Sequence, residues 1–151
     1  MNSLIKNEVL GTLAIQAILS HIPEQRLELT KALLILPFAF NKRIRSILKN
    51  KNVVFVGSRD LALSFPKDFA SINNHYLDLS TTSLNTMLLS CEMDLTRFDE
   101  NFLFLTKEVF TSETAKSVGK VGNEIFLAAP RIAKILEESA ADLYQNFRIS
   151  L

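Results

Sequence analysis

Few residues of this chain could carry out acid–base or nucleophilic chemistry. The sequence has two histidines, His21 and His75, a single cysteine, Cys91, and scattered carboxylates. Cys91 and His75 could form a dyad with an activated thiolate, because residues distant in sequence can meet in a fold. Cys91, however, shares an apolar helical stripe with Leu84, Met87 and Leu88, where a free cysteine is usually a small core residue. We therefore predict a protein that is not an enzyme.

The sequence contains no convincing pattern for a metal site or a phosphate-binding site. A closed zinc site would have to recruit carboxylates, and no ligand spacing indicates one. Gly119 and Gly122 flank a lysine before a helical segment, which superficially resembles a phosphate-binding loop. The segment lacks the longer glycine spacing and the Lys-Ser/Thr pair of such loops, so a flexible junction between helices is the favoured interpretation. No cofactor is expected, and any nucleotide hydrolysis in this system must come from another chain.

Charge is strongly segregated along the sequence. Seven of the 17 Lys and Arg residues, and none of the 16 Asp and Glu residues, lie between Leu29 and Arg59, although the net charge is only +1. Three of these bases, Lys42, Arg45 and Lys49, are three and four residues apart, so we expect them on one helix face that points away from the core. The candidate contacts to a nucleic acid or an acidic partner are Lys42, Arg43, Arg45, Lys49, Lys51 and Arg59. A merely solvated face is an open alternative.

An uninterrupted apolar stretch precedes these cations. Ala32–Phe40 is too short to span a bilayer, which needs about 20 residues, and it contains Pro37. Leu36, Pro37 and Phe38 are therefore predicted to be either core or protein interface. The chain also ends on apolar residues, and we expect them to pack against their own domain or a partner. These residues are Phe147, Ile149 and Leu151.

Length and composition predict one mainly helical domain over residues 1–151. A chain of this size can bury a single substantial core, and with four Gly and four Pro it has few interruptions. Helices are expected at 4–21, 24–40, 41–50 (with Asn41 as N-cap), 66–76, 112–117, 122–138 and 141–147, with one more beginning at Ser80 or Thr81. The single cysteine and the absence of a signal-like segment indicate a cytoplasmic protein with no membrane association.

Two segments have strand character. Asn52–Gly57 is rich in β-branched residues and predicts a short strand or an extended loop. Residues 93–107 predict a hairpin that turns at 99–101, because turn-forming residues separate two apolar runs. A hairpin directly after a helix resembles the wing of a winged-helix domain. The expected fold class is thus mainly α (α+β): a compact helical domain with a small β-hairpin, partly winged-helix-like.

Short anchors spread over most of the chain resemble a known family. They are Asn7-Glu-Val-Leu-Gly-Thr-Leu, Leu34-Ile-Leu-Pro37 followed by Asn41-Lys42 and Arg45, Thr82-Ser-Leu-Asn85, and Gly119 before an alanine-rich helix. The pattern is similar to that of the middle component of bacterial three-component ABC systems. His commonly stands where this chain has Asn41, and residues 52–65 match poorly.

The resemblance implies a small non-enzymatic subunit. Such a subunit would bridge an SMC-like or Rad50-like ABC ATPase and an effector protein in defence against phage or plasmid DNA, and its basic patch would contact DNA or an acidic partner. The alternative is a stand-alone winged-helix transcription regulator, which would bind its operator as a homodimer without an ATPase.

Overall fold

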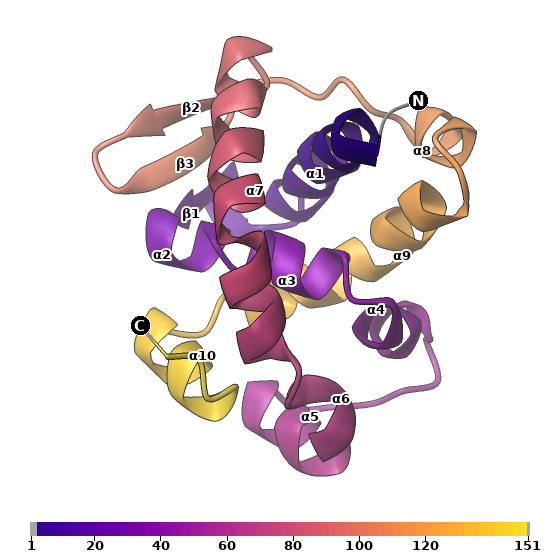
Figure 1. The fold of residues 1–151 in the computed structure, drawn as a ribbon, viewed down its shortest axis with the longest axis vertical. Helices are drawn as coiled ribbons and strands as arrows, with labels where there is room; N and C mark the ends of the chain where they lie inside the picture. The colour runs from indigo at the N-terminus through magenta and orange to yellow at the C-terminus, as the bar shows by residue number, and fades with distance from the viewer. Residues whose placement is uncertain (1–2, 151) are drawn as a thin grey trace.

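The computed structural model describes residues 3–150, with side chains from residue 7 onward, and the fold is mainly helical with one small antiparallel sheet (Figure 1). The longer elements are α1 (Ser3–Leu19), α4 (Lys42–Lys49), α7 (Ile72–Glu92), α9 (Lys120–Ile135) and α10 (Ala140–Asn146). Shorter helices are η1 (Pro23–Gln25), α2 (Leu29–Ala32), α3 (Ile35–Ala39), α5 (Ser58–Ser64), α6 (Pro66–Phe69) and α8 (Ser112–Ser117). The strands are β1 (Arg26–Glu28), β2 (Thr96–Asp99) and β3 (Phe102–Leu105). The expected α+β class is confirmed.

The predicted hairpin is present and belongs to a three-stranded sheet. Strands β2 and β3 pair around a turn in which Glu100 has a left-handed φ of 54°. Strand β1 adds to the other edge of β3, so the strand order is β1-β3-β2. β1 falls inside a span that the sequence predicted as helix, and that prediction is wrong. Glu24 and Gln25 adopt φ values of 61° and 52°, which end any helix before Arg26.

The apolar stretch around Pro37 lies in the core. Leu36, Pro37 and Phe38 are all buried in α3, which decides between the core and interface interpretations in favour of core. Pro37 occupies the first turn of α3, where its missing N–H has no intrahelical partner to lose. The helix expected over 24–40 instead breaks between α2 and α3, before the proline.

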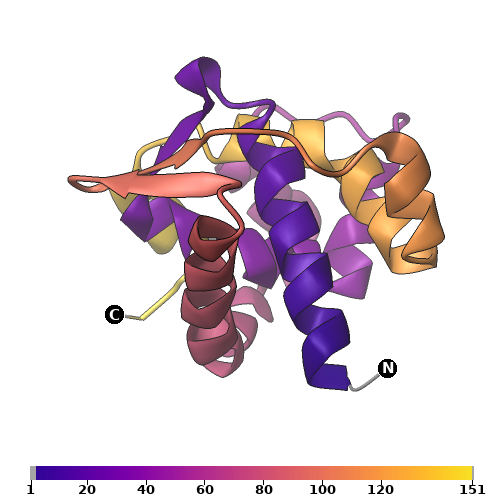
Figure 2. The same cartoon turned by 90° about the horizontal axis from the view of Figure 1, so that it is seen from above.

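Helix α1 is central to the core and runs beside α7 and α9 (Figure 2). Buried apolar residues from all three helices belong to one cluster. Helices α1 and α7 approach closely at Gly11, because a Cβ at this position would lie 2.5 Å from the Thr86 Cγ2 atom. Because glycine has no Cβ atom, Gly11 allows α1 and α7 to pack this closely.

The C-terminal segment packs on its own domain rather than awaiting a partner, which were the two alternatives that the sequence left open. The Phe147 ring lies between two core rings, edge-on to Phe38 at 5.3 Å and stacked on Phe69 at 5.5 Å between centroids. Ile149 is also buried. Leu151, the third apolar residue of the prediction, lies outside the described residues. Phe147 and Ile149 are thus core rather than partner contacts.

Helix α7 differs from the prediction of a break near residue 80. It continues unbroken from Ile72 to Glu92, so Ser80 and Thr81 are not N-caps. The Ser80 hydroxyl donates to the carbonyl of Leu77 (3.1 Å), which satisfies it inside the helix. Within residues 3–150, no helix is both long and apolar enough to cross a membrane.

Candidate functional site

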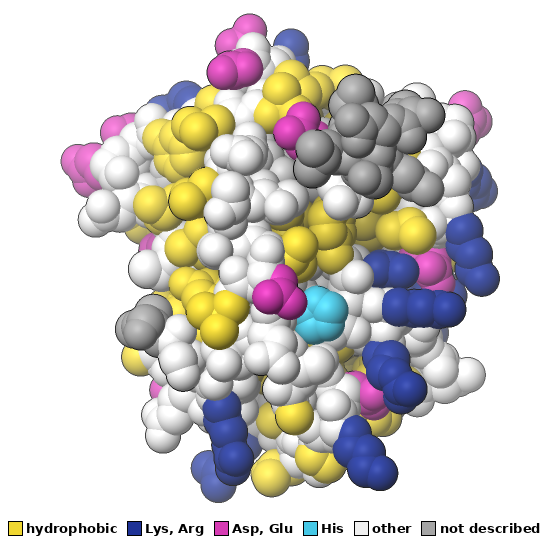
Figure 3. Space-filling view, in the orientation of Figure 1, with side chains coloured by type: hydrophobic (Ala, Val, Ile, Leu, Met, Phe, Trp, Pro, Cys, Tyr) yellow, Lys and Arg dark blue, Asp and Glu magenta, His cyan; other side chains and the backbone are white. Residues whose placement is uncertain are grey.

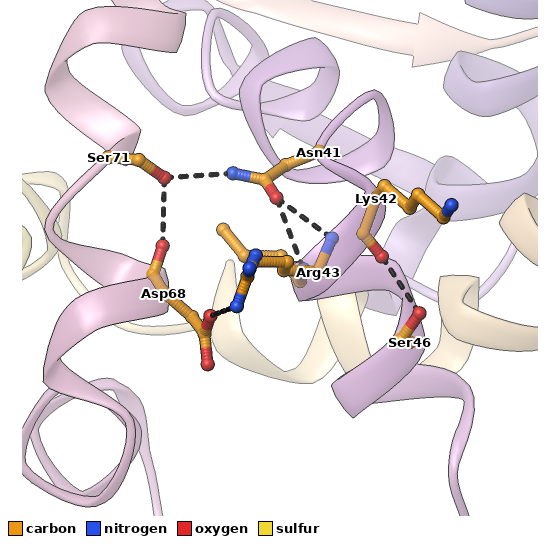
Figure 4. A network of polar contacts seen from close by, with 7 residues as sticks. Asn41, Lys42, Arg43, Ser46, Asp68 and Ser71 are labelled. Atoms are coloured by element: carbon orange, nitrogen blue, oxygen red, sulfur yellow. Dashed lines mark hydrogen bonds and ion pairs between the residues drawn. The ribbon is translucent and has the colours of Figure 1, made fainter.

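The basic helix α4 is fixed at its start by Asn41, as predicted. The Asn41 Oδ1 atom accepts hydrogen bonds from the backbone N–H groups of Arg43 (3.1 Å) and Ile44 (3.2 Å). Its Nδ2 atom donates to the Ser71 Oγ atom (3.1 Å), which ties α4 to the start of α7 (Figure 4). In the same view the Lys42 side chain points away from this network.

Arg45 does not belong to the exposed cationic face, contrary to the prediction. Its side chain is only 6% exposed and lies where α4 packs against α9. One guanidinium nitrogen donates to the carbonyl of Ala39 (3.0 Å), and the other lies 3.6 Å from the Glu124 carboxylate. The three-and-four spacing predicts a solvent face for Arg45, whereas its counter-charge, Glu124, comes from the distant helix α9. Arg45 is a structural ion-pair residue.

Two other predicted cations are also paired. The Lys49 Nζ atom lies 2.5 Å from the other Glu124 oxygen, and this hydrogen bond, aided by the charges of Lys49 and Arg45, lowers the pKa of Glu124 below its ordinary value. Arg43 pairs with Asp68 at 3.4 Å on the surface (Figure 4). Glu124 and Asp68 therefore neutralise part of the basic segment, because each carboxylate faces a cation.

The remaining predicted cations are exposed. Lys42, Lys51 and Arg59 form no ion pair among the residues whose side chains are described. Lys and Arg side chains gather on the right of Figure 3, over the region of α4 and the start of α9. Lys42 lies at the beginning of α4, whereas Lys51 lies in the loop between α4 and α5 and Arg59 in the first turn of α5. The structure thus places the free charge at two ends of this region rather than along one helix face.

The residues considered for catalysis do not meet. His75 and Cys91 both lie on the continuous helix α7, 16 residues apart, which corresponds to about 24 Å along the axis. The Cys91 Sγ atom instead lies 3.4 Å from the Thr96 hydroxyl. In the described part of the chain, no group of His, Cys, Asp and Glu residues could hold a metal ion.

Of the two glycines near residue 120, Gly119 has a conformational role and Gly122 a packing role. Gly119, with φ of 119°, joins α8 to α9 in a conformation that side chains disfavour. A Cβ on Gly122 would lie 2.5 Å from the Ala115 carbonyl oxygen, so the α8–α9 contact requires glycine there. Both observations agree with the expected helix junction.

Helix α7 exposes leucine and buries small polar residues. Leu77, Leu84 and Leu88 are 54%, 50% and 56% exposed, and their spacing of seven and four residues keeps them on one side of the helix. The opposite side buries Ser83, Thr86 and Ser90 among other residues. We call the exposed side, defined by Leu77, Leu84 and Leu88, the α7 leucine face. Apolar side chains gather over the upper half of α7 and the neighbouring hairpin in Figure 3.

The chain has no match among protein-family models, curated proteins or solved structures.

The α7 leucine face is also free of positive charge. Helix α7 contains no Lys or Arg, and its exposed residues include Asp78 and Glu92. The spacing of Leu84, Met87, Leu88 and Cys91 predicts one apolar stripe, but only Met87 of these is fully buried. Three exposed leucines on one side of a helix are a candidate binding surface.

Proposed function

We propose that this protein is a non-enzymatic adaptor that docks onto a protein partner through the α7 leucine face. The observation that carries the proposal is the exposure of Leu77, Leu84 and Leu88 on one side of α7. The buried side holds Ser83, Thr86 and Ser90 beside Ile72 and Met87. Three half-exposed leucines on one ordered helix form an apolar surface of the kind that partner helices cover. Their removal from water on binding would supply the main driving force for association.

Binding to protein is favoured over reading DNA with α7. In a winged-helix reader the helix before the wing would need cations to contact phosphates, and α7, which precedes the β2–β3 hairpin, has none. The hairpin turn is acidic, since Asp99 and Glu100 lie there. The lack of cations on α7 and the acidic hairpin turn make the alternative of a stand-alone transcription regulator less favourable.

The cationic region is proposed as a second contact surface. Its free charges are Lys42, Lys51 and Arg59, since Arg43, Arg45 and Lys49 face acids within the chain. A few scattered cations suit an acidic protein surface better than a long phosphate backbone, which requires many simultaneous contacts. Two surfaces of different character on one small body are what a bridging subunit needs.

The partners in this proposal come from the family resemblance. An SMC-like or Rad50-like ABC ATPase and an effector would be joined by this subunit in the cytoplasm, as part of defence against phage or plasmid DNA. In this arrangement ATP hydrolysis belongs to the ATPase, and the small subunit contributes binding only.

A pull-down from the native host tests this function. The tagged chain should recover an ABC ATPase together with a second, unrelated protein, both identified by mass spectrometry. Recovery of a homodimer that retains only DNA would contradict the proposal and favour a transcription regulator.

A further inference from the structure

The loop between α4 and α5 contains a segment whose residues alternate between exposed and buried. Val54 and Val56 are each 89% exposed, whereas Phe55 between them is buried. Alternation of this kind is the signature of a strand that covers a core on one side. Yet Val53–Val56 belongs to none of the strands in the described chain. Of the two sequence alternatives, a strand is therefore wrong, and the segment is a loop that bends at Val56 and Gly57.

Helix α9 fixes this segment in place. The Arg131 guanidinium donates to the backbone carbonyl of Asn50 (2.5 Å) and to that of Val53. It also lies over the Phe55 ring, 4.9 Å from the centroid, and Lys134 contributes a second cation–π contact to the same ring at 5.8 Å. The segment is therefore ordered before any partner binds, which lowers the entropic cost of association.

Two carboxylates hold the C-terminal end of the segment. The Asp60 carboxylate accepts the backbone N–H of Val56 (2.8 Å). Glu138 accepts both the N–H (2.8 Å) and the hydroxyl (2.6 Å) of Ser58. The amide and carbonyl of Val54 have no hydrogen-bond partner among the described residues. The backbone groups of Val54, which is 89% exposed, are therefore available to pair with a strand of another protein.

We propose that Val53–Val56 is a preformed docking strand for the edge strand of a partner protein that carries acidic residues beside an apolar strip. Val54 would pair through its free backbone groups, and the two exposed valines would fill the apolar strip. Lys51 and Arg59, which bracket the segment and are exposed, would face the partner's carboxylates.

Charge decides between a partner and a second copy of this chain. If two copies paired through this segment, Lys51 and Arg59 of one copy would lie near Lys51 and Arg59 of the other. Arg131 and Lys134, which contact Phe55, would add further positive charge. Like charges oppose such pairing. The two acids at the segment, Asp60 and Glu138, are already engaged with backbone groups. The occupant is thus a different protein of opposite charge. The inference rests on the second contact surface of the proposed function, because Lys51 and Arg59 belong to both, and it does not depend on the α7 leucine face.

A photo-cross-linking experiment in the native host tests the docking strand. Benzoylphenylalanine is placed at Val54 in the full chain, with Leu63 and Leu127 as exposed apolar control positions. We expect Val54 to cross-link at least tenfold more than either control to one other protein, within a peptide of alternating apolar residues that contains Asp or Glu. Lys51→Glu combined with Arg59→Glu should abolish that product without changing the melting temperature.

Other results would overturn the inference. Cross-linking to a second copy would assign the segment to self-association, and equal yields at Val54, Leu63 and Leu127 would indicate non-specific contact. A product that survives the two charge reversals, or no product at all from folded protein, would also contradict it. A pull-down that recovers the ATPase and effector while the Val54 product is absent would refute the docking strand alone.

Discussion

The guanidinium of Arg45 and the carboxylate of Glu124 lie 3.6 Å apart, both buried where α4 packs against α9. Glu124 also binds Lys49 at 2.5 Å, so one acid holds two cations of the basic helix. Burial makes such a pair costly to break, because the cation that remains has lost both water and partner. The position of α4 on α9 therefore depends on Glu124.

Replacement of Glu124 tests this dependence. Glu124→Gln should lower the free energy of unfolding by about 3 kcal/mol, since Arg45 would be left buried without a counter-charge. Urea denaturation at pH 7 measures the effect. Asp68→Asn is the matched control: its partner Arg43 is 82% exposed, so we expect a loss below about 1 kcal/mol. Equal losses in the two variants would contradict the buried pair.

The same carboxylate should make stability depend on pH. The pKa of Glu124 is lowered in the folded state, chiefly by its hydrogen bond to Lys49, so the unfolded state takes up the proton first as pH falls. The stability advantage of the wild type over Glu124→Gln should be complete at pH 7 and shrink below the ordinary glutamate value of about 4.3. Urea titrations at pH 7, 5, 4 and 3 measure it. An advantage that grows on acidification would be the opposite of this expectation.

Gly11 and Thr86 should be coupled in stability. Gly11→Ala places a methyl group 2.5 Å from the Thr86 Cγ2 atom, and overpacking of this kind costs about 1 to 3 kcal/mol. Thr86→Ala removes the clashing methyl group, so the cost of Gly11→Ala in that background should fall by at least about 1 kcal/mol. A double-mutant cycle by thermal denaturation measures the coupling. Additive effects would show that the helices can move apart.

Leu36 should behave as a core residue in the isolated protein. It is 1% exposed within α3, and Leu36→Ala should cost about 2 to 5 kcal/mol through lost burial and a cavity. Thermal unfolding of the purified protein checks this value. Leu29→Ala, at a partly exposed position on α2, is a control that should cost much less.

The sequence predicted most helices and the hairpin because their signals are local. Asn41 as N-cap, the turn near Glu100 and the bounds of α8 all follow from neighbouring residues. The misplaced elements depend on distant partners. Strand β1 exists because β3 is available to pair with it, and Arg45 turns inward because Glu124 arrives from α9. Neither partner can be read from local spacing.

The candidate surfaces were predictable only in part. The cationic segment was visible in the composition, but which charges are free depends on Asp68 and Glu124. The α7 leucine face was hidden, because Leu84 and Leu88 were assigned to a stripe with Met87. Thr86 and Gly11 show why: α7 packs on α1 through small residues at close range, which leaves its leucines on the far side.

The measurement that tests the central claim most directly compares partner recovery by three versions of the tagged chain in its native host. They are the wild type, Leu84→Gln combined with Leu88→Gln, and Leu127→Gln, whose leucine is 53% exposed on α9 and so matches the α7 leucines in exposure. Glutamine preserves helix propensity, so the melting temperatures should agree.

Isotope-labelled mass spectrometry gives the amount of each recovered partner. Loss of two interface leucines should remove at least about 2 kcal/mol of binding free energy, so the double variant should lose one partner more than tenfold while Leu127→Gln retains it. Recovery within twofold for all three chains, with the fold intact, would contradict docking through the α7 leucine face.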